Sequence, residues 1–316
     1  MEKVSIIIPC YNKARHVCEA VESALNQTYK NCEVIVVDDG STDSALDVLG
    51  PYIEQITLIQ QENQGGSAAR NAGISSASGS WIQFLDADDR IEPSKIETQL
   101  NHLSKAPEDS VAACAWNYFN EDGSEEKATP RLFWKDYDLG FDLLVDTWSH
   151  GGFLPCHSWL LPRHLIDQSS LWNTELSADD DGEFIGRILI HANQVRFTRS
   201  VLAGYRTPSL DGVSQSISDE SMLSVWEAWN LLSQAILEKE RTQRTTLACL
   251  RRLRFICYSI LNQRADLIEK ASHWEARNNR FDLCPYIPFL SRWLIALLGT
   301  KNGLRFQKRL KGVYRK

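Results

Sequence analysis

The chain has 316 residues, of which 43% are hydrophobic, and its formal net charge is −7 at neutral pH. This length suits two domains, or one domain with a large extension. All 41 acidic residues but only 26 of the 34 basic residues precede position 283, so the main body carries a net charge of −15, which excludes a surface built to bind nucleic acid.

Eight cysteines occur, and no two of them form a Cys-x-x-Cys pair. Most lie in apolar surroundings, which is typical of reduced, buried cysteines in a cytosolic protein. No ligand spacing characteristic of a zinc site is present. The first apolar run begins at Val4 and no run of 18 apolar residues occurs, so we expect neither a signal peptide nor a membrane span. The expected location is therefore the cytoplasm.

Apolar runs and amphipathic stretches alternate over the first 105 residues. The expected strands are 4–8, 33–37, 56–60 and 81–85, and the expected helices are 15–27, 44–53, 65–79 and 93–104. This alternation is typical of an α/β fold with a mostly parallel, doubly wound sheet flanked by helices. In such sheets the ligand lies across the carboxyl ends of the strands.

Unusual side chains follow three of these strands, in segments 9–12, 38–41 and 86–89. Because parallel strands end at the same edge of a sheet, we expect two acidic clusters and an aromatic residue to meet there. Clustered carboxylates repel each other, and a hard divalent cation would relieve that repulsion. The alternative is that Asp88 or Asp89 only caps the helix expected near Pro93.

The glycine-rich fingerprints of nucleotide-binding loops are missing. Gly65-Gly66 does not form a G-x-G-x-x-G after the first strand, and no G-x-x-x-x-G-K-[ST] occurs. Phosphate would then be bound by a cation and by Arg70, unless Arg70 is merely a surface residue of its helix.

The middle of the chain predicts strands at 110–116 and 195–199 and a region rich in Trp and His at 131–175. Aromatic rings of this kind either line a sugar-binding groove or pack in the core. Acidic residues 179–181 crowd the expected start of a helix. The helix dipole explains one or two of them, and a third, together with Glu183, indicates a general base.

Helices are expected at 219–239, 244–264 and 266–280, followed by a short apolar helix at 287–298. The basic end of the chain then gives residues 285–316 the character of an interfacial membrane anchor. The alternative is a helix packed on the body with a solvated basic end.

Four segments together resemble the family 2 inverting glycosyltransferases, which have the GT-A fold. The segments are Pro9-Cys10-Tyr11-Asn12, Val37-Asp38-Asp39-Gly40-Ser41, Asn63-Gln64-Gly65-Gly66 with Ala69-Arg70-Asn71, and Phe84-Leu85-Asp86-Ala87-Asp88-Asp89. Asp180-Asp181-Gly182-Glu183-Phe184 is similar to the family's segment that carries the catalytic base, with Asp in place of the usual first Glu. The resemblance covers residues 1–210.

The resemblance implies a role for each matching position. Nucleotide binding falls to Pro9, Tyr11, Asp38, Asp39, Arg70, Asp86 and Ala87, with Tyr11 against the base and Asp39 accepting its imide N–H. Asp88 would bind Mn²⁺ or Mg²⁺ on the diphosphate, and Asp181 would deprotonate the acceptor hydroxyl. Asp89 keeps its expected role as a helix cap.

The resemblance predicts a metal-dependent inverting transferase that moves a sugar from a UDP-sugar to a saccharide or lipid-linked acceptor in surface polysaccharide or glycolipid synthesis. The family's processive members carry Gln-x-x-Arg-Trp, of which only Arg292-Trp293 occurs here, so one sugar is expected per encounter. The alternatives are a nucleotidyltransferase and a non-catalytic nucleotide-sugar-binding module.

Three regions follow from this assignment. Residues 1–105 would bind the nucleotide-sugar, and residues 106–214 would bind the acceptor and carry the base. Residues 215–316 would form a helical extension whose basic tail contacts the cytoplasmic face of a membrane.

Overall fold

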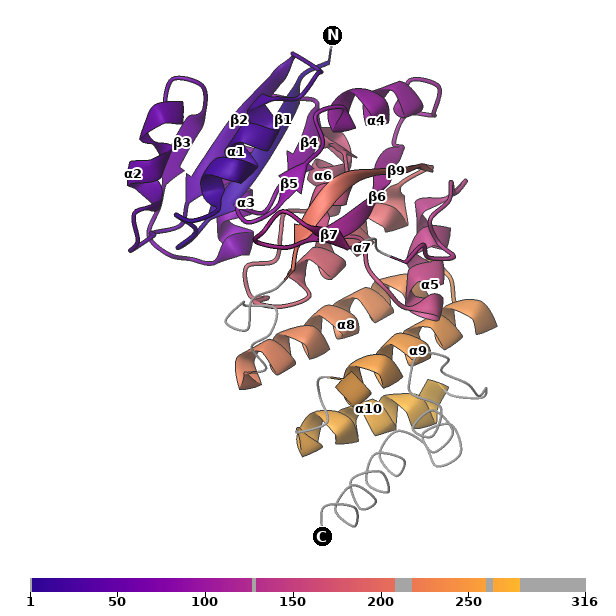
Figure 1. Ribbon diagram of the computed structural model, residues 1–316. Helices are drawn as coiled ribbons and strands as arrows, with labels where there is room; N and C mark the ends of the chain where they lie inside the picture. Colours follow the sequence, from indigo (N-terminus) through magenta and orange to yellow (C-terminus); the bar gives the residue numbers. More distant parts are fainter. Residues whose placement is uncertain (1, 127–128, 208–217, 260–263, 279–316) are drawn as a thin grey trace. The chain divides into compact units, whose positions relative to one another are not determined.

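The computed structural model describes residues 2–126, 129–207, 218–259 and 264–278. These residues fall into two compact units (Figure 1). The first is formed by Met1–Leu143 and Leu154–Gln215, and the second by Leu144–Phe153 and Ser216–Lys316.

The first unit contains a five-stranded sheet in the order β3-β2-β1-β4-β8. Its strands are β1 (Val4–Cys10), β2 (Cys32–Asp38), β3 (Thr57–Gln60), β4 (Trp81–Phe84) and β8 (Leu161–Pro162). The first four are parallel, and β8 runs antiparallel to β4 at the edge. The buried runs in β1 and β2 explain why these strands lie at the centre, since strands covered on both faces are apolar throughout.

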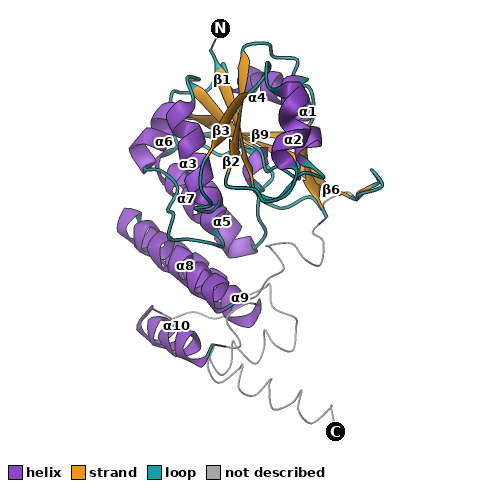
Figure 2. Cartoon of the chain, turned by 90° about the vertical axis from the view of Figure 1, so that its left-hand side faces the viewer, coloured by secondary structure: helices purple, strands orange, loops and turns teal. Residues whose placement is uncertain are grey.

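Helices cover both faces of this sheet, with α1 and α2 on one side and α3, α6 and α7 on the other (Figure 2). They are α1 (Val17–Leu25), α2 (Ala45–Leu49), α3 (Gly66–Ser76), α4 (Lys95–Leu103), α6 (Arg163–Ser169) and α7 (Asp180–His191), with a short 3₁₀ helix, η1 (Gly50–Tyr52), after α2. Helix α3 packs so closely on β1 that a Cβ added at Gly73 would lie only 2.4 Å from Ile7 Cγ2. The predicted α/β fold with a mostly parallel sheet is confirmed.

A second sheet of the same unit has the order β5-β9-β6-β7. Its strands are β5 (Arg90–Ile91), β6 (Val111–Phe119), β7 (Glu125–Glu126) and β9 (Val195–Arg206). Strands β6 and β9 are parallel, and the register shifts on either side of Ala115. Strand β9 continues well past the predicted end at 199, and its last residues run beside the segment that follows β4.

The second unit is helical, with α8 (Asp219–Lys239), α9 (Gln243–Ser259) and α10 (Ala265–Asn278). Ser218 and Ser221 form a capping box at the start of α8. The Trp229 indole donates to the Cys249 carbonyl at 3.2 Å. A buried ion pair joins Arg254 to Glu275. No helix within the described residues has the length and apolar character needed to cross a membrane.

Several elements escaped the sequence prediction. They are α5 (Gly140–His150), α6, β5, β7, β8 and η2 (Cys156–Ser158), a 3₁₀ helix. The expected helix at 287–298 and the basic tail 285–316 lie outside the described residues. The Trp-rich region contributes buried rings, since Trp159 and Trp172 are 3% and 2% exposed. For these two residues, packing in the core is therefore the correct interpretation of the two.

Candidate functional site

Three segments leave the first sheet at one edge, as the sequence predicts. Cys10 of β1 pairs with Asp38 of β2, and Ile7 pairs with Phe84 of β4. The backbone amide of Asp39 donates to the Cys10 carbonyl at 2.8 Å. We call this place, where residues 9–12, 38–41 and 85–89 leave the strands, the strand-end edge.

The turn after β1 is tied to the loop after β2 by Asn12. The side-chain oxygen of Asn12 accepts hydrogen bonds from the backbone amides of Thr42 and Asp43 at 2.8 and 3.3 Å. The backbone amide of Asn12 donates to Ser41 Oγ at 3.0 Å. Its φ of 52° is one that Asn tolerates better than most residues. Tyr11 beside it is 46% exposed, so its ring is available to a flat ligand.

Asp38 and Asp39 are both buried, at 3% and 2% exposure. Asp39 organises the 61–65 loop, because its two oxygens accept from the Gln61 side chain at 2.7 Å and from the Gln64 and Gly65 amides at 2.9 and 2.8 Å. Asp38 accepts only a long bond of 3.3 Å from the Ser41 amide on Oδ2, and its buried Oδ1 has no hydrogen-bond partner. A buried unpaired acceptor is costly, so Asp38 Oδ1 retains an unused capacity to accept a hydrogen bond.

Arg70 projects from α3 between two carboxylates. Its guanidinium lies 2.7 Å from Asp86 Oδ1 and 3.3 Å from Asp180 Oδ2, and it stacks over the Trp172 ring at 4.4 Å. Its side chain is only 11% exposed, so Arg70 is not the surface residue of the alternative interpretation. Burial alone would lower its pKa, but Asp86 and Asp180 raise it.

Asp86 and Ala87 follow β4 and face different surroundings. Burial would raise the pKa of Asp86, but Arg70 and then His157 hold it below its ordinary value. Asp86 Oδ2 accepts a bond from the Cys156 thiol at 3.4 Å. The methyl group of Ala87 is buried in the apolar core beneath the strands, so only its backbone can face a ligand.

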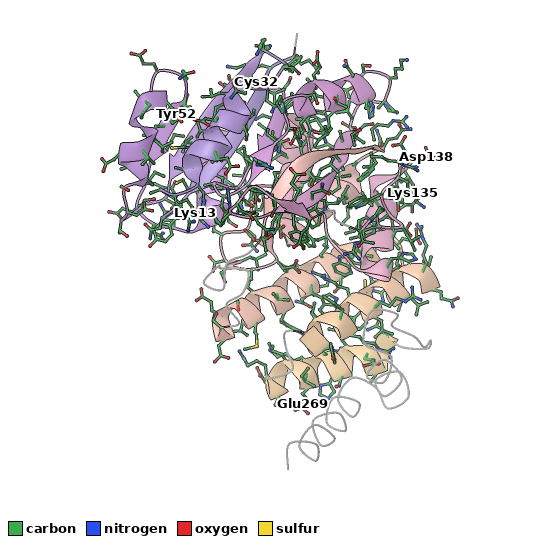
Figure 3. The ribbon with its side chains drawn as sticks, in the orientation of Figure 1. Lys13, Cys32, Tyr52, Lys135, Asp138 and Glu269 are labelled. Atoms are coloured by element: carbon green, nitrogen blue, oxygen red, sulfur yellow. The ribbon has the colours of Figure 1, made fainter. Side chains whose placement is uncertain are left out.

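Asp88 is the most accessible carboxylate of this segment, with a third of its side chain exposed. One of its oxygens pairs with the ammonium of Lys13, which lies at the strand-end edge (Figure 3). Hard carboxylate oxygens at an accessible position are the donors that Mg²⁺ and Mn²⁺ prefer. The residues present therefore fit the cation that the sequence predicts.

Asp89 does not cap a helix, so that expectation is wrong. Helix α4 starts at Lys95 with Ser94 as its N-cap. The buried Asp89 carboxylate instead accepts from the Arg206 backbone amide at 2.7 Å, and its other oxygen lies 3.1 Å from His157 Nδ1. Burial raises the pKa of Asp89 to about 6, although His157 opposes the shift.

Asp181 lies in the first turn of α7, where Asp179 starts the helix in a left-handed conformation with a φ of 58°. Burial, followed by the charges of Asp180 and Asp179, raises the pKa of Asp181 to about 7. Gly182 follows, and a Cβ there would lie 2.6 Å from Asp179 Oδ1, so a larger residue would force the Asp179 side chain to move. A carboxylate that titrates near neutral pH is suited to general base catalysis.

Two residues of β9 belong to this region and carried no signal in the sequence. The Arg206 side chain donates to the Asp88 carbonyl at 2.8 Å and pairs with Glu19. Burial, followed by Asp89, Asp86, Asp181 and Asp88, raises the pKa of the Tyr205 hydroxyl. That hydroxyl therefore lies in the field of the strand-end carboxylates and of the expected base together.

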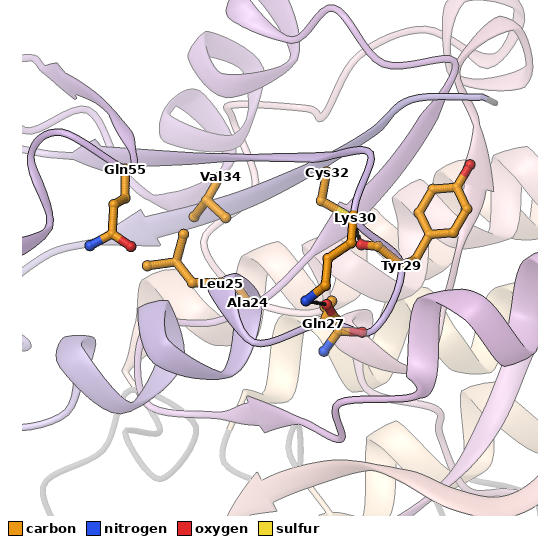
Figure 4. A pocket seen from close by; sticks show the side chains of 8 residues that line it. All are labelled: Ala24, Leu25, Gln27, Tyr29, Lys30, Cys32, Val34 and Gln55. Atoms are coloured by element: carbon orange, nitrogen blue, oxygen red, sulfur yellow. Dashed lines mark hydrogen bonds between the residues drawn. The ribbon is translucent and has the colours of Figure 1, made fainter.

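A separate hollow of about 70 Å³ lies at the other end of the first sheet (Figure 4). Its lining includes Leu25 of α1 and Cys32 and Val34 at the start of β2. No carboxylate lines it. It is therefore not part of the site at the strand-end edge.

Comparison with known proteins agrees with this arrangement. Residues 5–169 match the family Glycosyl transferase family 2. The glycosyltransferase GlyG of Streptococcus pneumoniae is 39% identical over 219 residues, which cover 66% of this chain and 72% of GlyG. An uncharacterized glycosyltransferase of Rickettsia typhi is 31% identical over 231 residues, covering 72% and 71% of the two chains.

Solved structures show the same fold. TarS residues 1–349 of S. aureus, in complex with UDP-GlcNAc, superposes with a TM-score of 0.71 at 18% identity, covering 98% of this chain and 92% of TarS. The complex of the same TarS segment with UDP gives a TM-score of 0.70. The predicted family and fold are confirmed, and the chain belongs to glycosyl transferase family 2, as a glycosyltransferase of the GT-A fold.

Proposed function

We propose that this glycosyltransferase moves one sugar from a UDP-sugar to an acceptor hydroxyl, with inversion at the anomeric carbon and with a bound Mn²⁺ or Mg²⁺ ion. The observation that carries the proposal is the position of Arg70, which joins Asp86 to Asp180. This side chain links the strand-end edge, where a nucleotide would lie, to the acidic start of α7, where the base would lie. The UDP and UDP-GlcNAc bound to TarS support a uridine donor.

The nucleotide side of the site is formed by the turns after β1 and β2. The exposed ring of Tyr11 would stack on the uracil, next to Pro9 near the end of β1. Asp38 would accept a ribose hydroxyl on its unpaired Oδ1. Asp39 would accept the uracil imide N–H on Oδ2, which also accepts one bond from the Gly65 amide.

The diphosphate would lie near Arg70 and Asp88, with the Ala87 backbone between Asp86 and Asp88. The cation held by Asp88 would supply Lewis-acid stabilisation of the charge on the leaving diphosphate. Arg70 would add a fixed positive charge, because Asp86 and Trp172 hold its guanidinium in one orientation. Lys13 would be displaced from Asp88 and thereby become free to face phosphate oxygens.

Transfer in this site needs one base and no covalent nucleophile. The acceptor oxygen bonds to the anomeric carbon while the bond from that carbon to the UDP oxygen breaks, and the hydroxyl proton passes to Asp181. A base with a pKa of about 7 is matched to this task at neutral pH. Attack opposite to the leaving diphosphate inverts the anomeric configuration.

The acceptor is proposed to be a saccharide or a lipid-linked saccharide of the cell surface. The basic residues of 285–316, which lie outside the described residues, would hold the enzyme at the cytoplasmic face of an anionic membrane. A chain lacking residues 284–316 should then bind anionic liposomes less tightly than the full chain. Equal binding would show that the tail does not contact the membrane.

The family assignment favours glycosyl transfer over both a nucleotidyltransferase and a non-catalytic binding module. The direct test is release of UDP from a panel of UDP-sugars with Mn²⁺ and an acceptor mixture. Asp181→Asn should retain UDP binding by calorimetry and lose transfer by several orders of magnitude. The matched control is Asp167→Asn, an exposed position of α6, which should leave transfer unchanged. Full transfer by Asp181→Asn would place the base elsewhere.

A further inference from the structure

Three potential metal ligands of different chemistry meet beside the strand-end edge. Asp86, Cys156 and His157 each offer a ligand atom, and these atoms all lie within 4.8 Å of one another. Within the described residues, no other group of three His, Cys, Asp or Glu side chains is assembled in this way. The proposed cation at Asp88 uses none of the three.

Hydrogen bonds hold the side chains of Asp86 and Cys156 facing each other. Arg70 binds Asp86 through Oδ1, which leaves Oδ2 turned toward η2, where the Cys156 thiol donates to it at 3.4 Å. Cys156 is only 3% exposed, so these two ligand atoms face each other within the protein. An ion on Oδ2 would therefore leave the ion pair between Arg70 and Asp86 intact.

His157 gives an independent indication of a missing ligand. Its side chain is fully buried, and Nε2 has no partner in the described residues. Nδ1 lies 3.1 Å from Asp89 Oδ2, and the ring stacks on Tyr205 with centroids 6.0 Å apart. A buried imidazole nitrogen is rarely left unsatisfied, and coordination of an ion would satisfy it.

We propose that Asp86, Cys156 and His157 bind a divalent ion of the zinc type, at a site distinct from the Asp88 cation. A thiolate, an imidazole and a carboxylate form a donor set that Zn²⁺ prefers, whereas Mg²⁺ and Mn²⁺ prefer oxygen ligands. Donor atoms of a tetrahedral zinc site are roughly 3.3–3.8 Å apart, so atoms that lie within 4.8 Å of one another need to approach by at most about 1.5 Å. On binding, the Cys156 thiol releases its proton to solvent, and the thiolate bonds to the ion.

Competition with the donor substrate is a consequence that rests on the proposed function. Asp86 belongs to the proposed nucleotide site, so an ion on its Oδ2 would change the charge that the nucleotide meets. Zn²⁺ should then weaken UDP binding in the parent chain and not in Cys156→Ser. Binding of the ion itself is tested without nucleotide, so its outcome is independent of the proposed enzymatic activity.

Titration of the full metal-free chain with Co²⁺ tests the site directly. We expect one Co²⁺ per chain, with a thiolate-to-metal charge-transfer band and the intense visible bands of a four-coordinate ion, all removed by one equivalent of Zn²⁺ and not by excess Mg²⁺. Cys156→Ser should lose the charge-transfer band, and His157→Gln should weaken binding at least about tenfold. The matched control is Cys32→Ser, a half-buried cysteine at the start of β2, which should keep the parent spectrum.

The proposal is overturned if the parent chain gives no charge-transfer band or if the band persists in Cys156→Ser. A second measurement needs no variant and therefore does not depend on how the variants fold. X-ray absorption of the zinc-loaded parent should show one sulfur at about 2.3 Å together with nitrogen and oxygen ligands at about 2.0–2.2 Å. A shell of nitrogen and oxygen only would place the ion elsewhere on the surface and refute the site.

Discussion

The guanidinium of Arg70 lies 2.7 Å from the Asp86 carboxylate in an ion pair that is largely buried. We expect Arg70→Lys to lower kcat/KM by on the order of 10²-fold, because an ammonium is a point charge that cannot bridge Asp86 and Asp180 while stacking on Trp172. The measurement is the rate of UDP release at saturating acceptor.

The same variant should lose about 1–3 kcal/mol of unfolding free energy in urea, since one buried carboxylate then lacks its partner. The control is Arg15→Lys, whose side chain is 75% exposed and pairs with Glu121. Its unfolding free energy should change by less than about 0.5 kcal/mol. If Arg70→Lys retains the parental kcat/KM, the forked geometry of the arginine guanidinium has no part in transfer.

The pH dependence of transfer should report the raised pKa of Asp181. The base acts only as a carboxylate, so kcat/KM should rise about tenfold per pH unit below pH 7 and level off above it. Initial rates between pH 5.5 and 8.5 give the profile, and circular dichroism over the same range checks that the fold is constant. A profile that is flat across pH 7 contradicts the assignment.

Asp181 should also destabilise the folded chain at neutral and higher pH. Its pKa is about 7 in the folded chain and about 3.9 when unfolded, so the folded state holds this proton more tightly and stability falls as pH rises from 4 to 7. Asp181→Asn removes the ionisation and should be about 1–2 kcal/mol more stable than the parent at pH 8.

That difference should shrink steadily toward pH 4, where the carboxyl group is protonated in the folded parent. Urea unfolding of both chains at pH 5, 6.5 and 8 measures it. An equal difference at all three values would show that packing, not charge, separates the two chains.

Asp88→Ala should abolish the part of UDP affinity that depends on Mn²⁺. Calorimetry with Mn²⁺ and with EDTA should differ at least about tenfold in Kd for the parent and not for the variant, since Asp88 is the proposed ligand of the cation. Its pairing with Lys13 is one-third exposed, so the variant should lose less than about 1 kcal/mol of stability. Asp122→Ala, at an exposed turn, serves as the control, and a metal effect that survives in Asp88→Ala refutes the ligand assignment.

Gly73→Ala should destabilise the first unit by about 1–3 kcal/mol. The added Cβ would lie 2.4 Å from Ile7 Cγ2, so α3 would have to move away from β1. Gly50→Ala is a matched control, because nothing lies within 4 Å of a Cβ there and its backbone is helical. Chemical unfolding of both variants tests this, and equal stabilities would show that α3 adjusts at no cost.

The strands of the first sheet were predictable because their signal is local. An apolar run such as 4–8 is buried wherever it pairs, and parallel order brings the residues that follow each strand to one edge. Tyr11, Asp38 and Asp88 were accordingly placed together from the sequence. Their separate roles at that edge stay predictions.

Other parts of the site depend on contacts between distant positions, which leave no local pattern. Arg70 and Asp180 are 110 residues apart, and no spacing rule connects them. Cys156 and His157 form no zinc motif with the third ligand, Asp86, because Asp86 precedes Cys156 by 70 residues. Asp89 was assigned as a helix cap because acidic residues before a helix often have that role. In the structure its carboxylate instead accepts a hydrogen bond from the backbone amide of Arg206 in β9.

The helical unit is not simply appended to the end of the chain, because it includes Leu144–Phe153 from the middle. Arg251 of α9, for example, donates to the Ser149 carbonyl at 3.5 Å. On the ribosome the segment Leu144–Phe153 emerges before α8, α9 and α10 are synthesised, so this unit can be completed only after those helices have emerged. Because the unit is built from two separate stretches of the chain, a single cut cannot separate the two units.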